Sequence, residues 1–164
     1  MKGIAMPSEY PIKQISSYED FDSCSGLEEI MHDFPYSSRK DFEMLKSGIE
    51  DGKYLLWVAF NPEGVPAGYV LCKPKQEHEN SLPGYGFYVA ERFVRKDERE
   101  KRICSRLIGL ASQEARRMGR SVIYEEVDIA NLPGIKSSSS LGFEEFSQAR
   151  YSKDTYSLRR KKLK

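Results

Sequence analysis

One charged segment, residues 91–110 (ERFVRKDEREKRICSRLIGL), constrains the fold of this chain more than any other. It begins with the end of an apolar strand, passes through a charged turn and enters a helix whose first turn is basic. A helix start presents backbone N–H groups that lack intrahelical acceptors, and the helix dipole favours an anion there. Arg99, Lys101 and Arg102 add full positive charges, which is typical of a pyrophosphate-binding turn. An exposed amphipathic helix with a basic wet face is the alternative, and this segment alone leaves both open.

The composition predicts a single domain over residues 1–164, long enough to bury a core without disulfides or a metal ion. Neither an internal repeat nor a linker is visible in the sequence. A formal net charge of +1 argues against nucleic acid or an anionic membrane as the main partner. Charge is uneven, however, because basic residues gather in 92–120 and 159–164. The basic helix and tail therefore leave nucleic-acid binding as a minor alternative.

The three cysteines, Cys24, Cys72 and Cys104, are far apart and lack a C-x-x-C spacing. They predict neither a disulfide framework nor a zinc site, and a reducing cytoplasm is the compartment we expect. No apolar signal core and no run long enough to span a bilayer is seen. Neither His32 nor His78 forms part of a catalytic or metal-binding pattern.

Hydrophobic periodicity predicts an α/β (α+β) fold, a mixed sheet flanked by helices, and leaves several mixed-sheet folds open. The expected strands are 12–15, 54–60, 67–72, 85–94, 121–129, 144–151 and 155–158. The expected helices are 17–31 with a possible break at Gly26, one from Ser37 or Ser38 to Gly52, one that follows the charged turn and ends at Gly119, and one from Asn131 to Leu141. Residues 74–84 are expected to form a polar loop.

The second half of the chain resembles the GNAT superfamily of acyl-CoA-dependent N-acetyltransferases. Four landmarks carry the resemblance: Val94 at a strand end, 99–104 (REKRIC) in the register of the R/Q-x-x-G-x-G/A motif, 127–131 (VDIAN), and 141–143 (LGF). The resemblance implies the GNAT fold, a central and mostly antiparallel sheet of six to seven strands flanked by about four helices. It also implies acetyl-CoA as co-substrate, no metal, and transfer of an acetyl or other acyl group to a primary amine.

The resemblance also implies the residues that bind coenzyme A. Residues 99–105 would hold the pyrophosphate, backbone N–H groups near Phe93 and Val94 would polarise the thioester carbonyl, and Asn131 would shape the turn after its strand. In the sequence these residues are Phe93, Val94, Arg99, Glu100, Lys101, Arg102, Ile103, Cys104, Ser105 and Asn131.

Two departures from the family pattern bear on function. Arg102 and Cys104 fill the two glycine positions of the motif, where the backbone must approach phosphates closely. With ordinary helical dihedrals a side chain is tolerated there, and Arg102 would then add a guanidinium to the site; the alternative is a blocked loop. Ser138 stands where the family often has a tyrosine that protonates the leaving thiolate, inside a four-serine run that is more typical of a solvated, weakly held helix end.

An ammonium substrate requires a general base, and the resemblance implies a carboxylate on the strand that leads to Val94. Glu91, three residues before Val94, is therefore the leading candidate, with a surface glutamate on a strand as the alternative. Glu125 and Glu126 point to opposite faces of their strand, so one of them is the fallback, acting through water. The acceptor is a small-molecule or protein amine, and Glu28, Glu29 and Asp33 would suit a cationic one, although solvated helix charge is the better explanation of them. A catalytically weak or inactive module that binds coenzyme A or a protein remains the alternative function. For either function we expect a monomer or a homodimer.

Overall fold

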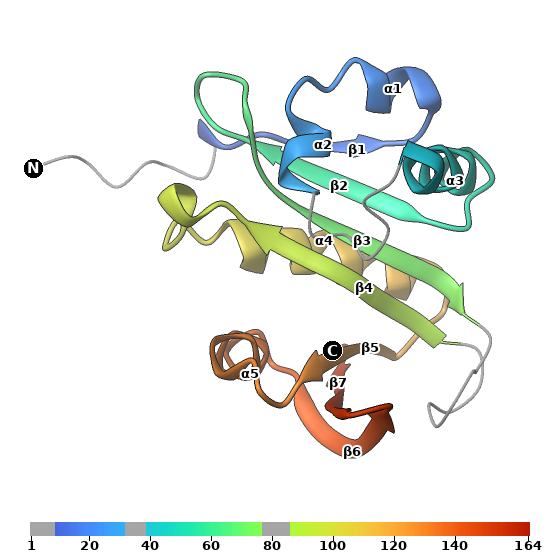
Figure 1. The fold of residues 1–164 in the computed structure, drawn as a ribbon, viewed down its shortest axis with the longest axis vertical. Helices are drawn as coiled ribbons and strands as arrows, with labels where there is room; N and C mark the ends of the chain where they lie inside the picture. The colour runs from blue at the N-terminus through green and yellow to red at the C-terminus, as the bar shows by residue number, and fades with distance from the viewer. Residues whose placement is uncertain (1–8, 32–38, 77–85) are drawn as a thin grey trace, which may run out of the picture. The chain divides into compact units, whose positions relative to one another are not determined.

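A computed structural model describes residues 9–31, 39–76 and 86–164 of the chain (Figure 1). The expected helix start at Ser37 or Ser38, both histidines and most of the expected 74–84 loop lie outside these residues. The strands are β1 (Ile12–Ile15), β2 (Leu55–Phe60), β3 (Pro66–Gln76), β4 (Gly86–Val94), β5 (Val122–Asp128), β6 (Glu144–Tyr151) and β7 (Asp154–Lys162). The helices are α1 (Tyr18–Asp22), α2 (Leu27–Ile30), α3 (Arg39–Glu50), α4 (Ile103–Arg117) and α5 (Leu132–Ser140), and Lys96–Glu98 form a 3-10 turn.

The strands form one seven-stranded sheet in the order β1-β2-β3-β4-β5-β7-β6. The pairs β1–β2, β2–β3, β5–β7 and β6–β7 are antiparallel, whereas β4 and β5 are parallel. The mixed α/β class and the strand number are therefore confirmed. Five helices are present in the described residues where about four were expected, because the first predicted helix is divided into α1 and α2.

The chain divides into two compact units, which are described separately below. Unit 1 comprises residues 1–72 and 91–109, and unit 2 comprises residues 73–90 and 110–164. β3, β4 and α4 each contribute residues to both units. None of the helices in the described ranges has the length and apolar character needed to cross a lipid bilayer.

The core of unit 1 lies between helices α1–α3 and one face of the β1–β3 strands. Phe21 of α1, Leu27 of α2 and Leu45 of α3 are buried against Val58 and Tyr69 of the sheet. Ring contacts add to this packing, since Phe21 and Phe42 lie 6.1 Å apart. The apolar positions that predicted these helices and strands are therefore the ones that form the core.

The break between α1 and α2 follows from local capping chemistry. Ser17 caps α1 by accepting the N–H of Asp20 at 3.0 Å, as its position predicted. Gly26 has a φ of 89°, a left-handed value that costs glycine little and that interrupts the helical path. The break that the sequence suggested at Gly26 is thus observed.

The β2–β3 hairpin is closed by Asn61. Its side-chain oxygen accepts the N–H groups of Glu63 and Val65, at 3.1 and 2.9 Å. An asparagine that bonds its own following backbone fixes a turn locally. β3 then continues to Gln76, beyond the strand end predicted at Cys72.

In unit 2, β5 lies between β4 and β7. Phe87 and Tyr88 of β4 pair with Ile123 and Tyr124 of β5. The rings of Tyr88 and Tyr124 stack at 5.4 Å, and Tyr124 meets Phe146 edge-on at 5.8 Å. These aromatic contacts anchor the β6–β7 hairpin to the parallel pair.

β7 is longer than predicted, extending to Lys162 rather than Leu158. Arg159 and Arg160 pair with β5 opposite Glu125 and Tyr124, so this part of the basic tail forms a sheet strand. Arg159 is buried, so its side chain is not part of an exposed basic tail, whereas Arg160, Lys162 and Lys164 are exposed.

Candidate active site

The segment after β4 forms a loop that leads directly into α4. The N–H of Arg95 donates to the carbonyl of Ala67 at 2.8 Å, which extends the β4 pairing by one residue. After the 3-10 turn, regular helical bonding begins when the N–H of Arg106 donates to the carbonyl of Arg102 at 3.1 Å. The N–H groups of Ile103, Cys104 and Ser105 therefore lie in the first turn of a 15-residue helix, where no intrahelical acceptor exists.

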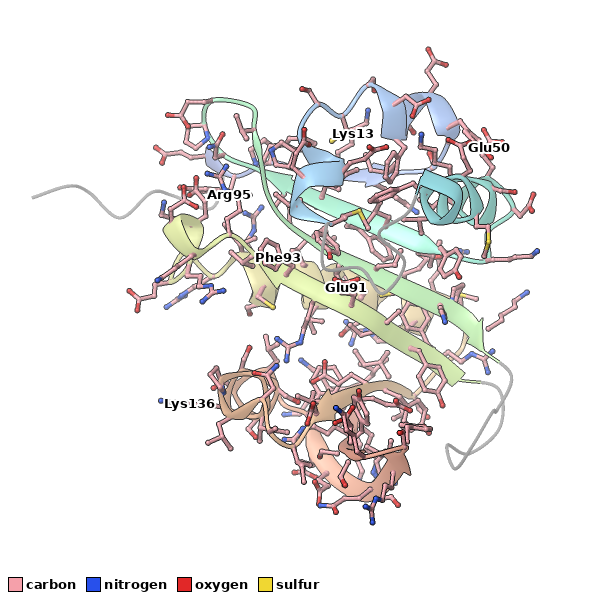
Figure 2. The ribbon with its side chains drawn as sticks, viewed as in Figure 1. Lys13, Glu50, Glu91, Phe93, Arg95 and Lys136 are labelled. Carbon is pink, nitrogen blue, oxygen red and sulfur yellow. The ribbon has the colours of Figure 1, made fainter. Side chains whose placement is uncertain are left out.

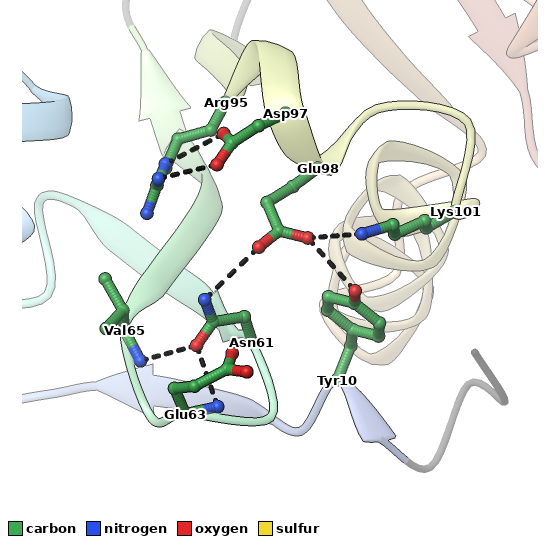
Figure 3. A network of polar contacts seen from close by, with 8 residues as sticks. All are labelled: Tyr10, Asn61, Glu63, Val65, Arg95, Asp97, Glu98 and Lys101. Carbon is green, nitrogen blue, oxygen red and sulfur yellow. Dashed lines mark hydrogen bonds and ion pairs between the residues drawn. The ribbon is translucent and has the colours of Figure 1, made fainter. Parts of the chain in front are cut away.

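The loop is held in place by the buried carboxylate of Glu98 (Figure 3). It accepts hydrogen bonds from Lys101 Nζ at 2.7 Å, Tyr10 Oη at 3.0 Å and Asn61 Nδ2 at 3.2 Å. Burial opposes the charged form, but these three donors outweigh it and hold the pKa of Glu98 below its ordinary value. The loop is therefore tied to the N-terminal segment and to the β2–β3 hairpin, and the sequence pattern gave no sign of this anchor.

The three cations of the predicted pyrophosphate turn have different roles. Lys101 pairs with Glu98 and lies over the ring of Tyr10 at 5.2 Å, so its charge is already compensated. Arg99 and Arg102 are exposed, and neither forms an ion pair within the described part of the chain. Arg99 Nε donates to the carbonyl of Val94 at 3.3 Å, which keeps its guanidinium close to the end of β4. Two of the three cations thus remain available to an anion.

The backbone of this loop adopts glycine-like conformations without glycine. Glu100 has a φ of 67° and Arg102 a φ of 58°, each costing roughly 1 kcal/mol for a residue with a Cβ. A side chain was expected to be tolerated at the two glycine positions if both have ordinary helical dihedrals. Cys104, inside α4, meets this condition, whereas Arg102 does not. Where a left-handed residue follows one of ordinary conformation, successive backbone N–H groups point to the same side of the chain. This arrangement is typical of anion-binding concavities in proteins.

Cys104 faces the neighbouring strand. Arg92 Nη1 lies 3.9 Å from its sulfur, so Arg92 and Cys104 contact each other across β4 and the start of α4. Glu91 and Phe93 are alternate residues of β4, and both lie on the side of Tyr69. Arg92 therefore lies beside the start of α4, whereas Glu91 lies beside Tyr69.

Glu91, the predicted general base, is partly buried in unit 1 (Figure 2). Its Oε1 accepts a hydrogen bond from the hydroxyl of Tyr69 at 2.5 Å. The Tyr69 ring is fully buried and lies 6.0 Å from the ring of Phe93. Tyr69 was not predicted from the sequence, because a tyrosine in an apolar strand gives no sign of a distant carboxylate partner.

In unit 2, Asn131 begins α5 as expected. Its side-chain oxygen accepts the N–H of Gly134 at 3.0 Å, and a Cβ at Gly134 would lie 2.5 Å from Asn131 Nδ2. Glycine at position 134 is what allows this close approach. Gly142, with a φ of 92°, then follows the end of α5.

Ser138, in the position of the family's tyrosine, is fully buried. Arg159 Nε donates to its hydroxyl at 2.6 Å, and Arg159 Nη2 donates to Ser139 Oγ at 2.8 Å and to the Phe143 carbonyl at 3.1 Å. The expectation of a solvated, weakly held helix end is wrong at Ser138, because the buried guanidinium ties this end of α5 to β7. Its hydroxyl is engaged and does not replace a tyrosine.

The remaining acidic candidates are also placed. Glu125 is buried and Glu126 is exposed, which confirms their opposite faces, and Glu126 accepts a hydrogen bond from Tyr151 at 3.2 Å. Glu28 lies 3.9 Å from the buried ammonium of Lys46, while Asp33 lies outside the described residues. Over the described ranges, no three His, Cys, Asp or Glu side chains gather as metal ligands would.

Comparison with known protein families shows to which family the chain belongs. The sequence model of the acetyltransferase (GNAT) family matches residues 18–143. The chain belongs to the GNAT acetyltransferase family. No curated protein matches it significantly by sequence.

Solved GNAT-type structures resemble the chain in fold at low sequence identity. The yncA protein of Salmonella typhimurium, solved with acetyl-CoA, has a TM-score of 0.69 at 20% identity, covering 94% of each chain. A variant of spermidine N-acetyltransferase SpeG from Vibrio cholerae has a TM-score of 0.70 at 14% identity, covering 95% of each chain. AAC(6')-Iy, bound to the bisubstrate analogue CoA-S-monomethyl-acetylneamine, reaches 0.74 at 14% identity, covering 88% of this chain and 97% of the other.

The GNAT motif thus occurs here in an altered form. Glycine is absent at 102 and 104, yet Arg102 adopts the backbone conformation that glycine favours. A helix start, left-handed residues and two exposed guanidiniums together fit an anion such as a pyrophosphate.

Proposed function

We propose that this GNAT protein is a cytoplasmic N-acetyltransferase that moves an acetyl group from acetyl-CoA to a primary amine by direct transfer. The observation that carries the proposal is the left-handed backbone of Glu100 and Arg102 at the start of α4, beside exposed guanidiniums. Three free cysteines far apart in the sequence are consistent with a reducing compartment.

Binding of coenzyme A is assigned to the loop of unit 1. Arg99 and Arg102 neutralise the pyrophosphate, and the N–H groups of Ile103, Cys104 and Ser105 donate to its oxygens. Lys101 supports the loop through Glu98, and Glu100 contributes its backbone turn. Backbone N–H groups near Phe93 and Val94 polarise the thioester carbonyl, and Asn131 shapes the start of α5 in unit 2.

Glu91 is assigned as the general base. An amine acceptor arrives mostly protonated at neutral pH, so a carboxylate must accept its proton before or during attack. The amine nitrogen then bonds to the acetyl carbonyl carbon and the C–S bond breaks. The nitrogen loses its surplus proton to water and the thiolate takes one from water, since the hydroxyl of Ser138 is engaged by Arg159. Exposed Glu126 is the fallback base, acting through water.

The acceptor is a small-molecule or protein amine, and a monomer and a homodimer are both compatible with the chemistry. Spermidine is the acceptor named for one structurally similar enzyme, and acetylneamine forms part of the analogue bound to another. Glu28 is no longer a strong argument for a cationic acceptor, because it lies close to Lys46. A panel of spermidine, an aminoglycoside and a lysine-containing peptide covers these classes.

Calorimetric titration with acetyl-CoA tests the binding loop. We expect the double variant Arg99→Ala with Arg102→Ala to bind at least tenfold more weakly, because two charge-assisted contacts are lost. Lys53→Ala with Lys136→Ala removes two exposed charges elsewhere and is expected to bind like the wild type. Unchanged affinity in the arginine double variant would exclude the loop assignment.

Turnover on the acceptor panel, followed as release of free thiol, tests the reaction. Glu91→Gln is expected to retain acetyl-CoA binding and to lose about 100-fold or more in kcat, the usual range for a general base. Binding of acetyl-CoA by the wild type without product from any acceptor would instead favour an inactive GNAT-like module.

A further inference from the structure

Tyr69, a buried residue of unit 1, donates its phenol hydroxyl to Glu91, the predicted base. Its side chain is fully buried, and its ring belongs to the apolar core formed with α1–α3. Its hydroxyl lies 2.5 Å from Glu91 Oε1. A donor at this distance from a carboxylate oxygen is typical of a charge-assisted O–H···O⁻ hydrogen bond.

We infer that Tyr69 is a positioning residue, which holds the Glu91 carboxylate in the orientation that receives the acceptor's proton. This inference rests on the proposed function, because it assumes that Glu91 acts as the base. Proton transfer requires the base to lie within hydrogen-bonding reach of the ammonium, so a carboxylate that rotates freely spends little time in the productive position.

The surroundings of Tyr69 give it the rigidity that this role needs. The Tyr69 ring is packed in the core, and the ring of Phe93 lies 6.0 Å away at an angle of 31°. Phe93 and Glu91 are alternate residues of β4, so their side chains lie on the same face of that strand. The strand therefore carries both the proposed base and the ring that lies beside Tyr69. A partner locked by packing restrains a glutamate more firmly than an exposed side chain does.

The variant Tyr69→Phe removes the hydroxyl and keeps the ring, so core packing is retained. We expect kcat for the best acceptor of the panel to fall about tenfold, a part of the general-base contribution, with KM for acetyl-CoA unchanged within twofold. Tyr18→Phe is the matched control, because it also removes one hydroxyl of unit 1, which donates to the Glu43 carbonyl at 3.2 Å. The control is expected to keep the wild-type kcat, and thermal unfolding checks that every variant is folded.

A double variant shows whether Tyr69 acts through Glu91. In the Glu91→Gln background, Tyr69→Phe is expected to cause no further loss of kcat, since the carboxylate that it orients is gone. Fully additive losses, or wild-type kcat in folded Tyr69→Phe, would overturn the inference while leaving the acetyltransferase assignment intact. Absence of turnover by the wild type, with acetyl-CoA bound, would instead refute the proposed function and the role of Tyr69 with it.

Discussion

Arg159 donates its Nε–H to the hydroxyl of Ser138 at 2.6 Å, and both side chains are buried in unit 2. The guanidinium also donates to Ser139, Ser157 and the carbonyl of Phe143. A buried arginine needs such donors satisfied, because a charge without partners is costly in the protein interior. The position that often carries a catalytic tyrosine in this family is therefore part of a structural network here.

Restoring the family's tyrosine at this position is expected to harm the protein. Ser138→Tyr forces a large side chain into a fully buried site and displaces Arg159, which should destabilise the fold by about 1–3 kcal/mol. Urea unfolding measures this loss, and Ser140→Tyr, at an exposed residue of the same helix, is the control. A stable Ser138→Tyr variant with raised kcat would contradict the structural role given to Ser138.

The left-handed backbone of Arg102 gives a prediction that compares two small residues. Arg102→Gly is expected to be more stable than Arg102→Ala by about 1 kcal/mol, because a Cβ is strained at a φ of 58°. At Cys104 the order reverses, and alanine is expected to be more stable than glycine by about 0.5–1 kcal/mol, because that position is helical. Chemical denaturation of the four variants gives both differences, and the same order at the two positions would refute the backbone assignment.

Glu98 makes the stability of unit 1 depend on pH. Its folded pKa lies below its ordinary value of 4.5, so its carboxylate stabilises the fold above that pH. This contribution is lost as the pH falls through the folded pKa. Glu98→Gln is expected to cost about 1–2 kcal/mol at pH 7 and less at pH 3, as the wild-type carboxylate becomes protonated.

Urea unfolding at the two pH values measures this effect. Glu63→Gln, in the exposed turn of the β2–β3 hairpin, serves as the control. An equal cost of Glu98→Gln at both pH values would show that the Glu98 hydrogen bonds do not depend on its charge.

Lys46 carries a buried ammonium that holds α3 to its neighbours. It lies 2.6 Å from Asp22, 3.4 Å from Glu43 and 5.3 Å from the centre of the Phe21 ring. Lys46→Met keeps an apolar chain of similar length but leaves the carboxylates without their cation, so we expect a loss of about 1 kcal/mol. Lys53→Met, at an exposed residue, should change the unfolding free energy by less than about 0.5 kcal/mol.

Local signals in the sequence predicted most element boundaries. Ser17, Gly26 and Asn131 each act through residues within four positions, so their effects are visible in a short window of sequence. The candidate base and the cations of the loop were found in the same way, from their distance to a strand end.

Other features depend on partners far away along the chain and were not predictable in this way. Arg159 read as part of a charged tail, because its partners Ser138 and Ser139 lie 21 and 20 residues before it. Lys101 read as a free cation, since nothing in the sequence shows that Glu98 is buried. The left-handed φ of Arg102 was not predictable from the sequence for a different reason, because an arginine gives no sign of such a backbone conformation.

The hydrogen bonds that Glu98 receives have a consequence for cooperativity. Tyr10 and Asn61 lie 88 and 37 residues before Glu98, so three distant stretches of chain meet at one carboxylate. The loop that begins α4 is held by contacts that exist only when those stretches have docked. Anion binding and docking are then thermodynamically linked, and each favours the other by the same free energy. If the loop binds coenzyme A as proposed, we expect the segment around Tyr10 to contribute to that affinity through the ordering of the loop, from a position outside the motif.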